Sequence, residues 1–309
     1  MGIAVIGPVF VDVKGYPLGA FNPAGRNMGR VETVFGGVSR NVAEDLANLG
    51  LQPVFVSLVD EGGNGDDVLA RLRDRGVDTR YVRRAKDSMG LWLAVFDDLG
   101  RVAASISKRP DFTPILETLE EDGDEIFRDC DSIALEIDAD ERIVSRVFRY
   151  AEKYGKDVYA VVSNMSIAAE RIGYIRKTKC LICNQEEAGL LFSEDYLNAT
   201  PEMIMKDLRV MMQSAGIPEM IVTMGAQGSV YADADGECGY CPAENITAKD
   251  TAGAGDSFFA GASAGLTYGK TLAEACRIGT KIAASVITSV ENVCPVFPKG
   301  TFGLGTAGD

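Results

Sequence analysis

The segment that decides the fold is Asp250-Thr-Ala-Gly-Ala-Gly-Asp256, which runs directly into Ser257-Phe-Phe-Ala-Gly261. Its small residues stand immediately before a predicted helix, so the backbone can turn sharply there and approach a ligand closely. The first turn of a helix offers unpaired N–H groups and the positive end of the helix dipole, and both stabilise phosphate. Asp256 stands at the start of this helix, where an aspartate can serve as the N-cap. The density of small residues favours a ligand site in addition to a cap.

Two further segments follow predicted strands and have a similar character. Thr223-Met-Gly225-Ala-Gln-Gly228 is suited to binding phosphate, and Asn184-Gln-Glu-Glu187 offers an amide and carboxylates as oxygen ligands for Mg²⁺. Each also has a plainer interpretation, a type II turn for the first segment and a helix cap with an acidic first turn for the second. Ligands of open α/β sheets bind outside the carboxyl ends of the strands, which is where all three segments fall.

Short runs rich in Val and Ile alternate with amphipathic stretches along most of the chain. This alternation predicts βαβ units and a mostly parallel sheet. Strands are expected over residues 3–6, 54–59, 133–137, 158–162, 180–183 and 220–223, and helices between Gly37 and Gly50 and over about 68–76, 140–154 and 271–288. The last helix begins with a predicted capping box, Thr271-Leu-Ala-Glu274.

Two stretches interrupt the alternation. Residues 12–35 are rich in Gly and Asn, and residues 90–106 alternate like a hairpin around a turn at Asp97–Gly100. Both lie beyond the ends of core elements. We expect them to pair into a small sheet that stands off the main one, with two ordinary surface loops as the alternative.

Charge and composition exclude several classes of protein. The chain has 309 residues and a net charge of −14, whereas a general nucleic-acid binder needs a basic surface. It contains no histidine, which excludes Ser-His-Asp triads, Cys-His pairs, and zinc or haem sites with histidine ligands. Any acid–base chemistry therefore depends on Asp, Glu, Lys, Tyr or Cys.

Three familiar kinds of site are not expected either. There is no Walker A motif, and the first strand leads to Gly7-Pro-Val-Phe-Val-Asp12 rather than to a GxGxxG turn. The seven cysteines include two CxxC pairs, Cys180–Cys183 and Cys238–Cys241, which are too far apart for a zinc ribbon. We expect buried, reduced thiols rather than a metal site.

We expect no secretory or lipid signal at the start of the chain. Met1-Gly-Ile-Ala-Val-Ile-Gly7 lacks a basic leader, and Ile6 replaces the Ser or Thr of a myristoylation signal. No apolar run approaches the ~18–20 residues of a membrane span. We therefore expect a cytoplasmic protein that acts on a small molecule and binds neither nucleic acid nor membrane.

The order and spacing of these motifs resemble the ribokinase-like (PfkB) carbohydrate kinases over nearly the whole chain. The motifs that carry the resemblance are Gly36-Gly37 with Asn41, Asn184 with Glu187, Thr223-x-Gly225, and Asp250–Asp256. The resemblance implies a single kinase domain over residues 1–309, with a three-layer α/β/α core around a mostly parallel sheet. That core comprises residues 1–11, 36–89 and 107–309, and a small β-sheet lid over the sugar site comprises about 12–35 and 90–106.

The resemblance also implies a reaction, the transfer of the γ-phosphoryl group of ATP to a sugar hydroxymethyl group. Asp256 matches the family's catalytic base, and Gly253, Ala254 and Gly255 match its anion hole. Asn184 and Glu187 match the family's Mg²⁺ motif, and the positions that match its nucleotide contacts are Thr223, Gly225, Gly228 and Asn184. The positions that match its substrate contacts are Asp12, Gly36, Gly37, Asn41, Arg40 and Glu136. Asp250 and the Ala252 carbonyl match a site for a monovalent cation, which is expected to be K⁺.

The first 50 residues are most similar to the pseudouridine kinases of this family. The similarity rests on Val11-Asp-Val-Lys-Gly15, Asn22, and Gly36-Gly-Val-Ser-Arg-Asn-Val-Ala43, and it implies phosphorylation of the 5′-hydroxyl of pseudouridine. Met28-Gly29-Arg30 and Trp92 depart from that pattern. The alternatives are a kinase for another nucleoside or for ribose, a fructose-type sugar or ketodeoxygluconate, and a non-catalytic regulator that binds a nucleotide or sugar.

The sequence leaves the roles of Arg40 and Trp92 open between two interpretations each. Arg40 either contacts substrate or is a solvated or salt-bridged helix residue, and Trp92 either belongs to the lid core or stacks on a base. Lid sheets in this family often pair between subunits, and the apolar residues Leu91, Trp92, Leu93 and Val95 suit such pairing. We therefore expect a homodimer formed through the lid.

Overall fold

The computed structural model describes residues 2–305 and contains one large and one small sheet. The large sheet has nine strands. In spatial order they are β13 (Cys238–Cys241), β12 (Ser229–Asp233), β11 (Glu219–Thr223), β10 (Cys180–Asn184), β9 (Val158–Val161), β8 (Ile133–Glu136), β1 (Ala4–Ile6), β4 (Val54–Asp60) and β5 (Val82–Ala85). All neighbours from β5 to β11 are parallel, and β12 at one end of the sheet pairs antiparallel with both β11 and β13. The predicted mostly parallel sheet is confirmed.

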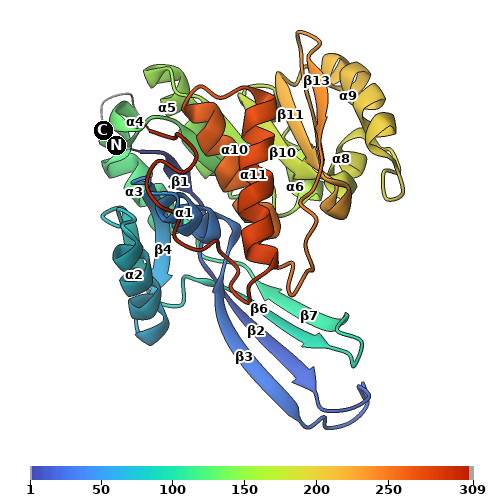
Figure 1. Cartoon of the computed structure of the whole chain (residues 1–309). Coiled ribbons are helices and arrows are strands. Elements are labelled where there is room, and N and C mark those ends of the chain that lie inside the picture. Colours follow the sequence, from blue (N-terminus) through green and yellow to red (C-terminus); the bar gives the residue numbers. More distant parts are fainter. Residues whose placement is uncertain (1, 306–309) are drawn as a thin grey trace.

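Helices cover both faces of this sheet, which gives the core three layers. The helices of one face are α1 (Val38–Asn48), α2 (Gly63–Arg75), α10 (Ala254–Thr267) and α11 (Leu272–Ile287). The others are α3 (Thr113–Glu121), α4 (Gly123–Asp129), α5 (Glu141–Tyr154), α6 (Met165–Ala169), α7 (Ile172–Ile175), α8 (Gln185–Phe192) and α9 (Pro201–Ala215). Figure 1 shows α10 and α11 side by side across the sheet, with α1 next to α10.

The helix boundaries follow the capping residues. The predicted capping box of α11 is present, since Thr271 Oγ1 accepts from the Glu274 N–H at 3.3 Å and the Glu274 carboxylate accepts from the Thr271 N–H at 2.9 Å. The helix predicted over 68–76 was wrong at its start, because α2 already begins at Gly63. Gly63 and Gly65 indicate a loop by composition, but both lie in α2, which packs on β4 and α1.

The predicted small sheet is also confirmed. Its strands, in spatial order, are β3 (Gly29–Gly36), β2 (Phe10–Pro17), β6 (Gly90–Phe96) and β7 (Val102–Lys108). It extends slightly beyond the expected residues 12–35 and 90–106, and it stands away from the large sheet as a separate layer (Figure 1). The central pair β2 and β6 is parallel, while β3 and β7 pair antiparallel at the two edges.

Strand register gives the small sheet two unlike faces. Phe10, Asp12, Lys14 and Trp92 share the face that turns toward the core. The opposite face is apolar and carries Val31, Leu93 and Ile106, whose exposed fractions are 71%, 39% and 71%. Within residues 2–305, no helix is both long and apolar enough to cross a membrane.

The apolar interior of the large sheet is the main source of stability. Ile221 in β11 is 0% exposed, whereas Val210 on α9 is 66% exposed. We predict that Ile221→Ala lowers the free energy of unfolding by about 2–5 kcal/mol, because the truncated side chain leaves a cavity. The matched control Val210→Ala should change it by less than about 0.5 kcal/mol. Urea denaturation measures both, and equal effects would contradict the assignment of β11 to the core.

Candidate active site

Two cavities adjoin at the carboxyl ends of the central strands. The first has a volume of about 840 Å³ and lies between the small sheet and the core, with Asp12 and Trp92 on one side and Glu136 on the other. The second has a volume of about 520 Å³ and is lined by Thr223, Gly225 and Gly228, with apolar walls from α10 and α11. This placement agrees with the rule that ligands of open α/β sheets bind at the strand ends.

The turn that begins α10 separates the two cavities. Ala252, Gly253 and Asp256 line the first cavity, whereas Ala254 and Gly255 line the second. Gly253 has a φ of 79°, and a Cβ atom there would lie 2.0 Å from the Asn292 carbonyl oxygen, so only glycine fits. The N-terminus of α10 therefore lies at the boundary between the cavities, where the positive end of the helix dipole favours negative charge.

Asp256 is held at this boundary by α1. The Asn41 side-chain amide donates to Asp256 Oδ2 at 2.8 Å. Burial raises the pKa of Asp256 to about 7, and the carboxylates of Glu187 and Asp12 add to the rise, whereas the Asn41 hydrogen bond and the Arg40 charge lower the pKa. A carboxylate whose pKa lies near neutrality, beside a cavity, is suited to accept a proton from a substrate hydroxyl.

Glu136 and its neighbour Asp138 form a second acidic group in the first cavity. Ser163 Oγ lies 2.9 Å from Glu136 Oε1 and 2.6 Å from Asp138 Oδ2. A hydroxyl has one proton, so Ser163 can donate fully to only one of the two carboxylates at a time. Burial raises the pKa of both carboxyl groups, and the Asp138 charge raises that of Glu136 further.

Most, but not all, of the residues predicted to contact the substrate line the first cavity. Asp12, Gly37, Asn41 and Glu136 line the first cavity as expected. Gly36 does not line it, and instead leaves room for the Asp12 carboxylate, since a Cβ on Gly36 would lie 2.5 Å from Asp12 Oδ2.

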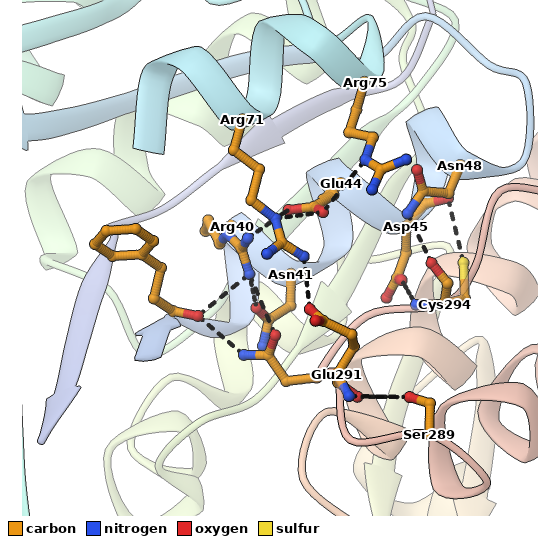
Figure 2. Close-up of polar contacts among 12 residues, drawn as sticks. Arg40, Asn41, Glu44, Asp45, Asn48, Arg71, Arg75, Ser289, Glu291 and Cys294 are labelled. Carbon is orange, nitrogen blue, oxygen red and sulfur yellow. Dashed lines mark hydrogen bonds and ion pairs between the residues drawn. The ribbon is translucent and has the colours of Figure 1, made fainter. Parts of the chain in front are cut away.

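Arg40 lines neither cavity and pairs with Glu44 in the interior (Figure 2). The expectation that Arg40 contacts substrate is therefore corrected. Arg40 is a buried, salt-bridged helix residue that donates a hydrogen bond to Asn41, a residue that does line the first cavity. The position of Arg40 directly before Asn41 suggested a contact with substrate, but the side chain at position 40 turns inward.

Trp92 belongs to the small sheet, and its stacking on a base stays a prediction. It lines the first cavity and also packs edge-to-face on Phe96 of the small sheet, with ring centroids 6.5 Å apart. Sequence reasoning missed Asp138, Ser163 and Asn292, which also line this cavity. A polar side chain two residues after Glu136 was the available signal for Asp138, because both follow the same buried strand.

Asn184 and Glu187 form a capping box at the start of α8. Asn184 Oδ1 accepts from the Glu187 N–H at 2.9 Å, and Glu187 Oε2 accepts from the Asn184 N–H at 2.8 Å. Burial raises the pKa of Glu187, and the nearby Asp138 charge adds to the rise. The helix-cap interpretation is therefore present, and the Glu187 carboxylate also interacts electrostatically with Asp138 and Asp256.

The donor chemistry fits Mg²⁺ in that place. Oxygen donors are its usual ligands, and it commonly binds through one or two carboxylates together with substrate phosphates and water. Among residues 2–305, no group of three His, Cys, Asp or Glu side chains is arranged to hold a metal by itself. Asp250 Oδ1 accepts from the Ala252 N–H at 2.9 Å, so the two residues predicted for a monovalent cation lie in one turn.

The remaining sequence expectations concern the second cavity and the cysteines. Thr223, Gly225 and Gly228 line the second cavity, but the segment forms a single 3₁₀ turn, η1 (Gly225–Gln227), rather than a type II turn. All seven cysteines are free thiols, and six of them are buried, with Cys238 half-buried. The CxxC pairs lie in β10 and β13.

A cavity for an acceptor and a cavity for a phosphate donor, joined at a helix N-terminus, are what a kinase requires. The comparisons with known proteins agree. Residues 2–295 match the model of the pfkB family carbohydrate kinases. The chain therefore belongs to the pfkB family, and it is a kinase of a sugar or nucleoside.

The chain is also similar to individual kinases of this family. The chain is 33% identical over 298 residues to a guanosine-inosine kinase of Exiguobacterium acetylicum, covering 94% of this chain and 95% of the relative. It is 26% identical over 285 residues to the pseudouridine kinase of Escherichia coli, covering 89% and 87%. The structure of Arabidopsis thaliana ribokinase has the same fold, with a TM-score of 0.81, 21% identity, and coverage of 96% and 95%.

Because Asp256 is buried, the stability of the parent protein relative to an Asp256→Asn variant should depend on pH. Its pKa is higher in the folded protein than the ordinary 3.8, so ionisation destabilises the fold progressively as pH rises from about 4 to about 7. We predict that Asp256→Asn is more stable than the parent protein at pH 8, by about 2–4 °C in Tm or more, and that this gain disappears at pH 4. Calorimetry at both pH values measures it.

The control for that comparison is Asp98→Asn in the exposed lid turn, which should show no such pH-dependent gain. A Tm of Asp256→Asn that is equal to or below that of the parent protein at pH 8 would contradict the buried, unfavourable charge at position 256.

Proposed function

We propose that this protein transfers the γ-phosphoryl group of ATP to the 5′-hydroxyl group of a ribonucleoside, with guanosine and inosine as the first candidates. The observation that carries the nucleoside class is the first cavity itself. Its volume of about 840 Å³ is at the upper end of the ~300–1,000 Å³ typical of sites for drug-sized ligands, and Trp92 forms part of its wall. A pentose alone needs less space and no aromatic surface, whereas a base can stack on an indole ring.

The similarity to the guanosine-inosine kinase supports a purine nucleoside, because it is stronger in identity and in coverage than the similarity to the pseudouridine kinase. Pseudouridine remains the second candidate, on the strength of the Gly36-Gly-Val-Ser-Arg-Asn41 motif and the polar lid segment. Ribose, fructose-type sugars and ketodeoxygluconate follow. A non-catalytic regulator is disfavoured, since Asp256, the glycine turn and both cavities are all present.

The proposed mechanism assigns a task to each group at the boundary between the cavities. Asp256 accepts the proton of the 5′-hydroxyl, whose oxygen attacks the γ-phosphorus from the first cavity. The amides of Gly253, Ala254 and Gly255 stabilise the charge that develops on the transferred phosphoryl group. The second cavity holds the nucleotide, with Thr223, Gly225 and Gly228 near its phosphates and Phe258 and Ile287 against its base.

Cations reduce the repulsion between phosphates and carboxylates in this proposal. Bound Mg²⁺ neutralises phosphate charge, and Asn184 and Glu187 would hold it through water and phosphate oxygens. Asp250 and the Ala252 carbonyl would hold K⁺ beside the turn. The whole chain then acts as one kinase domain, which the small sheet closes as a lid to exclude water. A reaction that consumes ATP also agrees with a cytoplasmic location.

The test is ADP release with ATP, Mg²⁺ and K⁺ over a panel of acceptors. The panel contains guanosine, inosine, pseudouridine, uridine, cytidine, adenosine, ribose, fructose and ketodeoxygluconate. We predict that kcat/KM for guanosine or inosine exceeds that for every free sugar and for pseudouridine by about tenfold or more, since a purine base fills more of the cavity than a pyrimidine base or a sugar alone. Preference for pseudouridine would establish the second candidate, and preference for a free sugar would overturn the nucleoside proposal.

Asp256→Asn is the matched control for this assay. Its kcat should fall by about 10²–10⁴, the usual contribution of a general base, while ATP affinity stays close to that of the parent protein. A variant that kept more than about a tenth of the activity would show that Asp256 is not the base.

We also propose that a second copy of the chain covers the apolar face of the small sheet. Val31, Leu93 and Ile106 come from three different strands and lie together on the face that turns away from the first cavity. Monomeric proteins rarely expose a contiguous apolar face of this kind. The two edge strands β3 and β7 also present unpaired backbone groups, which a second sheet can cover.

The oligomeric state tests this proposal. We predict a dimer by light scattering at micromolar concentration, and a monomer for Ile106→Lys, because a buried unpaired charge would be strongly unfavourable at the interface. Val210→Lys on α9 is the control and should leave the mass unchanged. A parent protein with monomeric mass would contradict the proposal.

A further inference from the structure

Arg40 in the first turn of α1 is an arginine with only 1% of its surface exposed. Arginine is almost never fully buried unless it is paired. Here Nη2 pairs with the Glu44 carboxylate one helical turn further along, and Arg71 of α2 donates through Nε to the same carboxylate at 2.8 and 3.0 Å (Figure 2). The guanidinium group of Arg40 is therefore held on one side by the fully buried Glu44 carboxylate, which also pairs with Arg71.

The other side of the guanidinium group faces Asn41. Nη1 of Arg40 donates to Asn41 Oδ1 at 2.9 Å. A guanidinium group can only donate hydrogen bonds, so the Asn41 amide must present its oxygen to Arg40 and its NH₂ group in the opposite direction. In that direction the NH₂ group donates to Asp256 Oδ2 at 2.8 Å. The chain Glu44–Arg40–Asn41–Asp256 thus leaves only one orientation of the amide.

We propose that Arg40 is a positioning residue for the phosphoryl transfer, because it holds the Asn41 amide in the one orientation that donates to Asp256 and keeps this carboxylate directed into the acceptor cavity. The inference rests on the proposed role of Asp256 as base. If Arg40 is lost, the amide is free to rotate, and its oxygen can then face the Asp256 carboxylate and repel it.

The charges around Asp256 support this role. The acidic groups that face it are Asp12 of β2, Asp45 of α1, Glu136 of β8 and Glu187 of α8. Burial and the negative charges raise the pKa of Asp256, while the Asn41 hydrogen bond and the Arg40 charge lower it. The Arg40 charge also lowers the pKa of Asp12. The pair Arg40 and Asn41 therefore favours the ionised form of the base.

Contacts to the lid strand do not depend on Arg40 alone. Nη1 of Arg40 lies 3.3 Å from the Phe35 carbonyl oxygen and 3.4 Å from Asn292 Oδ1. Asn292 Nδ2 itself donates to the Phe35 carbonyl oxygen at 3.0 Å. The end of β3 therefore keeps a hydrogen bond if Arg40 is replaced, and substrate binding should change less than turnover.

Arg40→Met and Arg71→Met form the matched pair that tests the inference. Both remove a cation from Glu44, and in each variant the other arginine still pairs with Glu44, but only Arg40→Met removes the donor to Asn41. We predict that Arg40→Met loses about tenfold to hundredfold in kcat, with KM for the nucleoside changed by less than about threefold. Arg71→Met should keep kcat within about twofold of the parent value, even where it lowers Tm.

A double-mutant cycle identifies the route of the effect. In an Asn41→Ala background, Arg40→Met should cause no further loss of kcat, because Arg40 acts through the Asn41 amide. Losses that multiply in the double variant, or equal losses of kcat in Arg40→Met and Arg71→Met, would overturn the inference and leave Arg40 with a purely structural role.

A second variant covers the case in which Arg40→Met does not fold. Replacing both Arg40 and Glu44 by Met removes the whole ion pair and leaves no buried unpaired charge, which is often neutral for stability. This double variant should show the same loss of kcat. Glu44→Gln retains Arg40 beside Asn41, so it should keep most of the kcat of the parent protein. A double variant with the kcat of the parent protein would overturn the inference.

The same assays separate this inference from the proposed function. An Asp256→Asn variant that stays active contradicts the proposed base, whereas an inactive Asp256→Asn together with an active Arg40→Met contradicts only the positioning role. If the panel shows that a free sugar is the substrate, the same ratios of kcat are measured with that sugar, since Asp256 faces the acceptor hydroxyl in either case.

Discussion

The packing of α1 against α10 is the contact on which the rest of the site depends. Two neighbouring pairs join these helices, with Asn41 donating to Asp256 at 2.8 Å and Ser257 donating to the buried Asp45 at 2.6 Å. Asp45 also accepts from the Cys294 N–H at 2.6 Å, so the segment after α11 is bound to the same helix. One face of α1 thus sets the position of the glycine turn, the candidate base and the loop that carries Asn292.

This packing places acidic groups where they are unfavourable in the absence of ligand. Burial raises the pKa values of Asp45 and Asp256 to about 7 and also raises that of Glu136. Such shifts are typical of sites where the fold gives up stability for chemistry. The cations of an ATP-bound state, together with the α10 amides, would relieve this repulsion, which connects the stability of the site to its proposed function.

The sequence predicted the central strands well and the sheet edges poorly. Continuous apolar runs such as Val54–Val59 identify parallel strands that are buried on both faces. The edge strands β5 and β13 gave no comparable signal, because Val82–Ala85 contains two arginines and Cys238–Cys241 is short and partly exposed. The strand β12, which pairs with β13, was not predicted either. The small sheet was predictable from alternation in residues 90–106, and its parallel pairing of β2 with β6 required the structure.

Local chemistry alone determined the glycine turn and the helix that follows it, because backbone freedom depends only on neighbouring residues. Asp256 lies in the first turn of that helix, but the expected N-cap role falls to Gly253, which has no side chain to cap with. The partners of these residues were decided by the tertiary structure. Asn41 and Asp256 are 215 positions apart, and Arg40 turns inward only because Glu44 and Arg71 meet it there. Whether a charged helix residue faces solvent or a buried partner depends on which helix packs over it. The spacing of residues along the chain does not indicate such contacts between distant segments.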